Sequence, residues 1–195
     1  DVVGETGTTD DGWRGLIAPE SVSATDGSST SHARITWAAS PDATKYQIFR
    51  GTSPDPSTMI GVKDFKTVPA ELSWEDTGAA PGTLYYYSVK AGGTGGWSEF
   101  GAVDDGYRKL MPPGNVLATD GTLNRQVKVT WKAVTGATHY RVSRAESDSG
   151  EKVPWGGWQT ELSFTDVSCV GTNKYWYYVE AAVDETGLRP SVYSA

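Results

Sequence analysis

The chain has 195 residues, a formal net charge of −7 and a single cysteine, which allows two small domains but no intrachain disulfide. The negative charge argues against a nucleic-acid partner and against binding to anionic lipid, because both interactions need a basic surface. No apolar run reaches the roughly 18 residues that cross a bilayer, so no membrane insertion is expected.

The opening segment, residues 1–18, begins at Asp1 without a methionine and is rich in glycine and threonine. Its sequence Asp10-Asp11-Gly12-Trp13-Arg14 returns 94 residues later as Asp104-Asp105-Gly106-Tyr107-Arg108. We therefore predict that residues 1–18 form a tail or linker that resembles the end of a preceding repeat.

Residues 19–108 show the alternation of apolar and polar side chains that is typical of β-strands. The pattern is clearest in residues 33–37, 46–49 and 85–91, with turns containing glycine or proline between these segments. No segment combines helical periodicity with caps. These residues are predicted to form one small all-β domain.

A second copy of this pattern occupies residues 114–195, after a short proline-containing linker at 109–113. Trp131 follows Trp37 by 94 residues, whereas Ser163 to Asp166 follow Ser73 to Asp76 by 90. The second copy is therefore four residues shorter between its third and fifth strands. The two prolines and the apolar residues of the linker predict a stiff, rod-like pair.

Seven short strands per copy, each with one apolar face, predict a sandwich of two sheets. Further motifs are a tryptophan in the second strand, Tyr-x-aliphatic in the third, and the run Pro81-Gly82-Thr83-Leu84-Tyr85-Tyr86-Tyr87-Ser88-Val89-Lys90-Ala91. With these motifs both copies resemble fibronectin type III domains, of the kind found in tandem in secreted bacterial proteins. The resemblance implies an all-β chain of two tandem seven-stranded immunoglobulin-like sandwiches, with Tyr85 and Tyr175 as tyrosine corners.

The alternation predicts which side chains lie between the sheets. We expect these to be Trp37, Trp131, Tyr46, Tyr140, Tyr87, Tyr177, Val89 and Val179. Cys169 aligns with Ala79, at a position that the family fills with a buried apolar residue. It is therefore expected to be a small core residue rather than a nucleophile.

No enzymatic activity is expected. The two histidines are unrelated in sequence: His32 lies in a loop beside serines, and His139 opens a strand and points to solvent. No nucleophile motif and no metal-spaced cluster is present. Adjacent acids such as Asp104 and Asp105 do not face each other, so they offer no acid–base geometry.

The repeated Asp-Asp-Gly sequences suggest one cofactor hypothesis. Oxygen ligands gathered at domain junctions can hold calcium, and Asp10-Asp11 and Asp104-Asp105 both lie at such junctions. The alternative is that each Asp-Gly forms a turn with solvated carboxylates and that the protein binds no cofactor.

A polysaccharide is one candidate partner. Trp176 and Tyr178 are predicted to point outward beside the strand that carries Arg141, and Trp97 ends a glycine-rich loop. Exposed aromatic rings beside an arginine would suit the stacking of a saccharide. The alternative is a cross-strand contact between aromatic and arginine side chains that shields the sheet.

The two ends of the chain suggest self-association. The second copy has no counterpart of residues 103–108, so its last strand is predicted to be truncated. One interpretation is a slice of a longer array, flanked by repeats of the same kind. The other is strand addition, in which the N-terminal segment of one molecule completes the last strand of the next. The proposed donor residues are Thr9, Asp10, Asp11, Gly12, Trp13 and Arg14.

These features together predict an extracellular or cell-surface structural protein. It would be a rod-like spacer, or the subunit of a head-to-tail filament or surface array assembled through strand addition. The alternative is a polysaccharide-binding or spacer module attached to a secreted carbohydrate-active enzyme.

Overall fold

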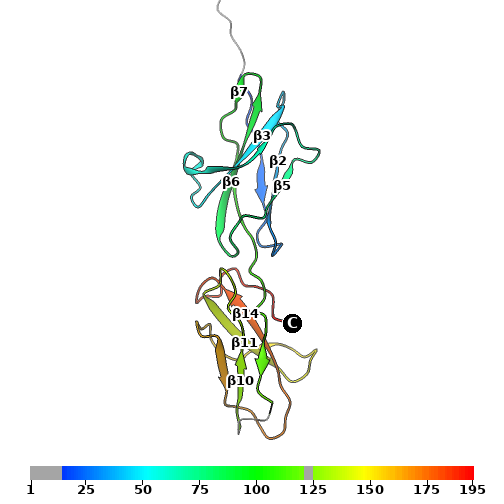
Figure 1. Ribbon diagram of the computed structural model, residues 1–195, viewed down its shortest axis with the longest axis vertical. Helices are drawn as coiled ribbons and strands as arrows, with labels where there is room; N and C mark the ends of the chain where they lie inside the picture. Colours follow the sequence, from blue (N-terminus) through cyan, green and yellow to red (C-terminus); the bar gives the residue numbers. More distant parts are fainter. Residues whose placement is uncertain (1–14, 121–124) are drawn as a thin grey trace, which may run out of the picture.

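The computed structural model describes residues 15–120 and 125–195. These residues form two β-sandwiches that follow each other along the longest axis of the molecule (Figure 1). Among them the helical structure is a single 3-10 turn, η1 (Pro56–Thr58). The predicted all-β fold class is confirmed.

The first sandwich consists of two antiparallel sheets. One has the strand order β1-β2-β5, formed by β1 (Val22–Ala24), β2 (Ala33–Trp37) and β5 (Ser73–Asp76). The other has the order β4-β3-β6-β7, and β8 pairs with β6 as well. Its strands are β3 (Lys45–Gly51), β4 (Ile60–Phe65), β6 (Leu84–Gly93), β7 (Gly96–Trp97) and β8 (Val103–Tyr107). The segments β7 and β8 are two parts of one interrupted last strand, because both pair with β6.

The second sandwich repeats this arrangement with strands of equal or shorter length. One sheet has the order β13-β10-β9 and the other β12-β11-β14. The strands are β9 (Leu117–Ala118), β10 (Val127–Thr130), β11 (His139–Ala145), β12 (Val153–Pro154), β13 (Ser163–Asp166) and β14 (Trp176–Ala182). In place of a regular last strand, Ser194 donates its backbone N–H to the Val179 carbonyl at 2.9 Å, and Ser191 donates to Ala181 at 2.8 Å.

This pairing explains the strand count. Seven strands per copy were predicted, and the first sandwich has seven when β7 and β8 are taken as one. The second has six regular strands among the described residues, followed by the hydrogen-bonded segment 191–194.

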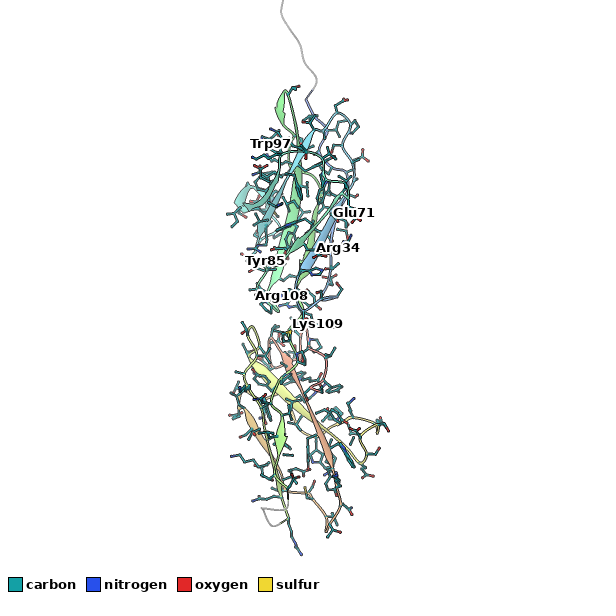
Figure 2. The ribbon with its side chains drawn as sticks, turned by 45° about the vertical axis from the view of Figure 1, so that its right-hand side comes forward. Arg34, Glu71, Tyr85, Trp97, Arg108 and Lys109 are labelled. Carbon is teal, nitrogen blue, oxygen red and sulfur yellow. The ribbon has the colours of Figure 1, made fainter. Side chains whose placement is uncertain are left out.

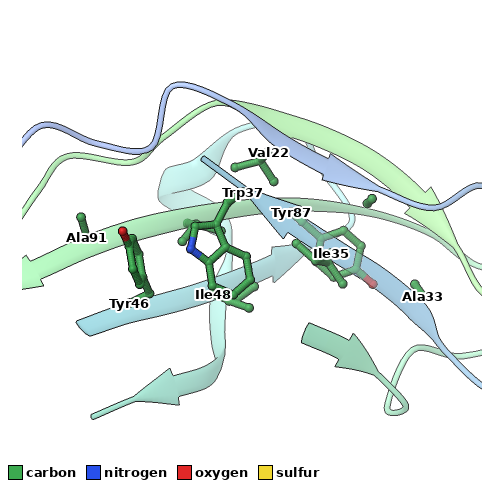
Figure 3. Packing of buried hydrophobic residues seen from close by; sticks show 10 residues of the cluster. Val22, Ala33, Ile35, Trp37, Tyr46, Ile48, Tyr87 and Ala91 are labelled. Carbon is green, nitrogen blue, oxygen red and sulfur yellow. The ribbon is translucent and has the colours of Figure 1, made fainter. Parts of the chain in front are cut away.

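The core lies between the sheets, where alternation placed it. Trp37 and Trp131 are each 5% exposed, and Tyr46 and Tyr140 pack against them with ring centroids 5.6 and 5.8 Å apart. Figure 3 shows this cluster in the first sandwich, with Tyr87 on the same side of the sheet. Val89 and Val179 are also fully buried. These seven predictions are confirmed.

Two burial predictions are wrong, and both concern one end of the second sandwich. Tyr177 and Cys169 are half-buried, whereas their counterparts Tyr87 and Ala79 are 0% and 1% exposed. The difference arises because β8 and the residue after it cover this region in the first sandwich. In the described part of the second sandwich no strand pairs with β14 at this end.

Candidate functional site

The junction between the sandwiches is built from the linker itself. The Gly82 N–H donates to the Arg108 carbonyl at 2.8 Å, and the Lys109 N–H donates to the Ser29 carbonyl at 2.8 Å. The Arg108 guanidinium donates to the Thr30 carbonyl through Nε at 2.6 Å. Figure 2 shows Arg108 and Lys109 where the two sandwiches meet. The first half of the linker is thus a fixed part of the first sandwich.

The next residue of the linker belongs to the second sandwich. Leu110 is 0% exposed and lies in the second hydrophobic core with Val129 and Trp131. Consecutive residues of the chain are therefore bound to different sandwiches, with no slack between them.

Two glycines allow the sandwiches to approach closely at this point. A Cβ placed on Gly136 would lie 2.2 Å from the Pro81 carbonyl oxygen, and one on Gly82 would lie 2.6 Å from Val183 Cγ1. Both glycines have positive φ, of +87° and +73°. Each of these approaches joins one sandwich to the other, so any larger side chain at either position would push them apart.

A buried ionic network recurs at one end of each sandwich. Asp76 accepts hydrogen bonds from Arg50 at 2.6 Å and from the Tyr87 hydroxyl at 3.1 Å. In the second sandwich Asp166 accepts from Arg144 and from the Tyr177 hydroxyl, each at 2.9 Å. Burial raises the pKa of both tyrosines well above the usual value. For Tyr87 the neighbouring Asp76 carboxylate is the second cause.

The expected tyrosine corners take part in these networks. The ring of Tyr85 stacks on the Arg50 guanidinium at 4.5 Å, and the ring of Tyr175 stacks on Arg144 at 4.4 Å. The Tyr175 hydroxyl accepts the Val170 N–H at 3.4 Å, a bond to upstream backbone of the kind that defines a tyrosine corner. The networks brace the corners, which is a structural role.

Comparison with known proteins bears on this arrangement. No protein-family model matches the sequence, and no curated protein matches it. A two-domain fibronectin type III segment from chicken tenascin aligns with 91% of the chain and 97% of its own length, at 16% identity and a TM-score of 0.66. The chain is a tandem pair of fibronectin type III-like domains.

Other structures are similar to this tandem pair. A cytokine receptor complex aligns with 90% of the chain and 100% of its own length, at 19% identity and a TM-score of 0.52. An Fn3-like protein from Clostridium thermocellum covers 50% of the chain and 98% of its own length, at 32% identity and a TM-score of 0.43. The tenascin and cytokine receptor likenesses support the sandwich fold of the fibronectin type III-like pair.

The residues predicted for sugar binding do not converge on one site. Trp97 is 40% exposed on the first domain, at the end away from the junction (Figure 2). Trp176, Tyr178 and Arg141 lie on the same face of the β11–β14 sheet. Arg141 is bound to Glu180 at 2.7 Å and lies 4.7 Å from the Trp158 ring. The Tyr178 hydroxyl donates to the Asp148 carbonyl at 2.6 Å.

The Asp-Asp-Gly sequence of the first domain does not form a turn, which was the alternative to calcium binding. Asp104, Asp105 and Gly106 lie within β8, opposite Tyr87, Tyr86 and Tyr85. Asp104 accepts the Ala24 N–H at 2.9 Å, so its carboxylate serves the fold. Among the described residues no group of three or more His, Cys, Asp or Glu side chains could hold a metal. Asp10 and Asp11, the other acids of the calcium hypothesis, lie outside the described residues.

The histidines have polar neighbours that sequence spacing did not reveal. His32 Nδ1 lies 2.9 Å from the Ser31 hydroxyl, and its Nε2 lies 3.5 Å from Glu75, whose side chain is 57% exposed. His139 Nδ1 lies 2.8 Å from the Thr138 hydroxyl. A serine, a histidine and a carboxylate thus follow one another at His32. The Glu75 carboxylate lies on the surface, and the His32 side chain is partly exposed.

The predicted donor segment, Thr9 to Arg14, lies outside the described residues. In the part of the chain that is described, no helix is long and apolar enough to cross a membrane.

Proposed function

We propose that this tandem pair is a non-enzymatic structural module that acts outside the cell or on its surface. It serves as a rod-like spacer, or as the subunit of a head-to-tail filament or array. The observation that carries the proposal is the junction, where Lys109 is bound to the first domain and Leu110 is buried in the second. The sandwich fold is common in cell-surface proteins, which supports the location.

The junction supports stiffness on energetic grounds. Bending at the linker would withdraw Leu110 from the second core or break the backbone bonds of Arg108 and Lys109. Exposing a buried leucine side chain alone costs about 1.5–3 kcal/mol, several times the thermal energy. The fibronectin type III-like domains are therefore expected to keep one relative orientation.

Small-angle X-ray scattering on the purified chain tests the rod. The unmodified chain is expected to fit one extended shape, and Gly136→Ala to change it, because the added Cβ meets the Pro81 carbonyl at 2.2 Å. Gly114→Ala and Gly171→Ala are controls, since a Cβ at either position has nothing within 4 Å. Gly171 also has positive φ, at +56°, and so controls for backbone strain. An unmodified chain that scatters as a flexible ensemble would contradict the proposal.

The alternative function, a polysaccharide-binding or spacer module of a secreted carbohydrate-active enzyme, has weaker support. A stacking platform needs free aromatic faces, but Lys152 lies 4.4 Å from the Tyr178 ring and Lys174 lies 5.5 Å from the Trp176 ring. Binding of a soluble polysaccharide that Trp176→Ala abolishes and Trp97→Ala leaves unchanged would favour this alternative.

A further inference from the structure

The internal repeat identifies an unpaired strand edge on the second domain. In the first domain, β8 pairs with β6 over Leu84–Ser88. The corresponding residues of the second domain are 174–178, at the start of β14. In the described chain β14 pairs with β11 on one side, and residues 174–178 pair with no strand on the other. Backbone donors and acceptors on that edge are therefore open to an added strand.

Side-chain exposure follows the same boundary. Ala24 lies beneath β8 and is 7% exposed, whereas its counterpart Ala118 is exposed. Tyr87 is also fully buried, whereas Tyr177 is half-buried. In the first domain the segment 103–108 covers all of these positions, so the second domain presents the surface that such a segment covers.

Two cavities of the second domain coincide with this surface. One, of about 470 Å³, is lined by residues that include Ala118, Lys174 and Tyr177. The other, of about 390 Å³, is lined by residues that include Val167 and Cys169. In the first domain, Thr77 and Ala79 are the equivalents of Val167 and Cys169. Their carbonyls accept hydrogen bonds from Arg108 at 3.4 and 3.5 Å. The second cavity therefore lies where an arginine would follow the added strand.

We propose that Thr9–Arg14 of a second copy of this chain binds this edge as an added β-strand. The proposal deepens the structural role given above and rests on it. Asp10 would accept the Ala118 N–H, as Asp104 accepts the Ala24 N–H in the first domain. Arg14 would enter the second cavity, as Arg108 donates to the carbonyls of Thr77 and Ala79. The larger cavity is also lined by Arg125 and Lys174, whose positive charges would attract Asp10 and Asp11. One acid, Asp120, lines it as well.

The glycine of the signature has a steric role in this fit. A Cβ on Gly106 would lie 2.7 Å from the Ala24 Cβ and 2.9 Å from the Thr25 carbonyl oxygen. Gly12 stands at the equivalent position of the donor. The likeness also continues beyond the signature, because Leu16 and Pro19 occupy the places of Leu110 and Pro113.

The donor must come from another molecule. Leu16 contacts the end of β6 at Gly93, where an added Cβ would lie 3.2 Å from Leu16 Cδ1. This end is the one away from the junction, which lies near Leu84, and the ten residues of β6 span about 33 Å. Trp13 is two residues from Gly15 and so within about 7 Å of it. It cannot reach Lys174 on the second domain of its own chain, and the contact therefore joins molecules head to tail.

Cys169 provides a direct test, because it is the only cysteine of the sequence and lines the second cavity. The full chain is kept dilute and its reaction with a disulfide reagent is timed with and without a peptide of residues 8–19. Saturating peptide is expected to slow the reaction about tenfold, because thiol reactivity requires access. The same peptide with Gly12→Val is the matched control and is expected to leave the rate unchanged. Equal protection by both peptides, or by neither, would overturn the proposed site.

The identity of the occupant is tested on the full chain by sedimentation and electron microscopy. The unmodified chain is expected to form linear assemblies as its concentration rises, and the Gly12→Val chain to remain monomeric. A chain that stays monomeric while the peptide protects Cys169 would overturn the second copy as occupant and favour a segment that follows residue 195 in a longer polypeptide. The Gly12→Val monomer still reports rod stiffness by scattering, so the two proposals fail separately.

Discussion

Asp166, the buried last residue of β13 in the second domain, accepts four hydrogen bonds through its carboxylate. Its Oδ1 accepts the Ser168 N–H at 2.9 Å and the Ser168 hydroxyl at 2.6 Å, and its Oδ2 accepts from Arg144 and Tyr177. Burial acts to raise the pKa of the Asp166 carboxyl, but these bonds outweigh it and hold the pKa well below the usual value. The folded state therefore favours the ionised form.

The consequence is acid sensitivity of the second domain. Because the folded pKa of Asp166 is depressed, its contribution to stability is complete above the unfolded pKa of about 3.9 and is lost as pH falls below it. Asp166→Asn is expected to cost about 3–5 kcal/mol at pH 7, since it leaves Arg144 buried without its anion. Urea unfolding from pH 7 to pH 2 should show this difference shrink in acid. Glu161→Gln, an exposed carboxylate nearby, is the control, and a difference that does not vary with pH would contradict the linkage.

Sequence alternation identified the core residues but not this network. Trp37 and Trp131 follow from period-two alternation alone, whereas Arg144 was not placed. It stands two positions after Val142, on the inward face of β11, and that inward position was the available signal. Its partner Asp166 is 22 residues away, so only the repetition of the pair as Arg50 and Asp76 could have linked them.

At the scale of the element, β8 shows why a turn motif can form a strand. Asp-Gly favours turns in isolation, and the turn alternative for residues 104–106 was based on that preference. In the fold Gly106 is opposite Tyr85, and β1 approaches it so closely that only a glycine fits. Tertiary packing thus overrode the local preference, and neither spacing nor composition contains that information.

The close approach at Gly106 predicts a local loss of stability. Gly106→Val is expected to destabilise the first domain by about 1–3 kcal/mol, because the new side chain overlaps Ala24 and Thr25. The Ala24 N–H donates to Asp104, so its hydrogen exchange should become faster when β8 is released from β1. Gly114→Val, where an added Cβ meets nothing within 4 Å, is the matched control. Unchanged protection of Ala24 in Gly106→Val would show that β8 does not depend on this contact.

For the whole molecule, the tandem repeat was visible in the sequence, and the manner in which the two domains join was not. The prolines of the linker predicted stiffness, but the structure attributes the contact to Gly82 and Gly136, which come from loops far apart in the chain. The partial burial of Tyr177 also escaped alternation, because it depends on whether a strand covers the edge of β14 rather than on the position of Tyr177 in its own strand.

The same two glycines predict how a head-to-tail assembly would differ from the chain that builds it. At a contact between molecules, Asp42 would stand in the place of Gly136, and Gly171-Thr172 in the place of Pro81-Gly82. Asp42 shares the positive φ, at +63°, but it has a Cβ where the junction within the chain leaves no room for one. The two kinds of junction therefore cannot be identical.

A filament of this chain is accordingly expected to repeat every two domains, with alternating junction geometry. Helical reconstruction from electron micrographs would measure this repeat. Asp42→Gly is expected to shift the contact between molecules towards the geometry of the internal junction, because it removes the side chain that blocks close approach. Lys132→Gly, an exposed position on the second domain, is the control for a general effect of glycine. A filament whose repeat is one domain would show that the two junctions are equivalent and that Asp42 does not hold them apart.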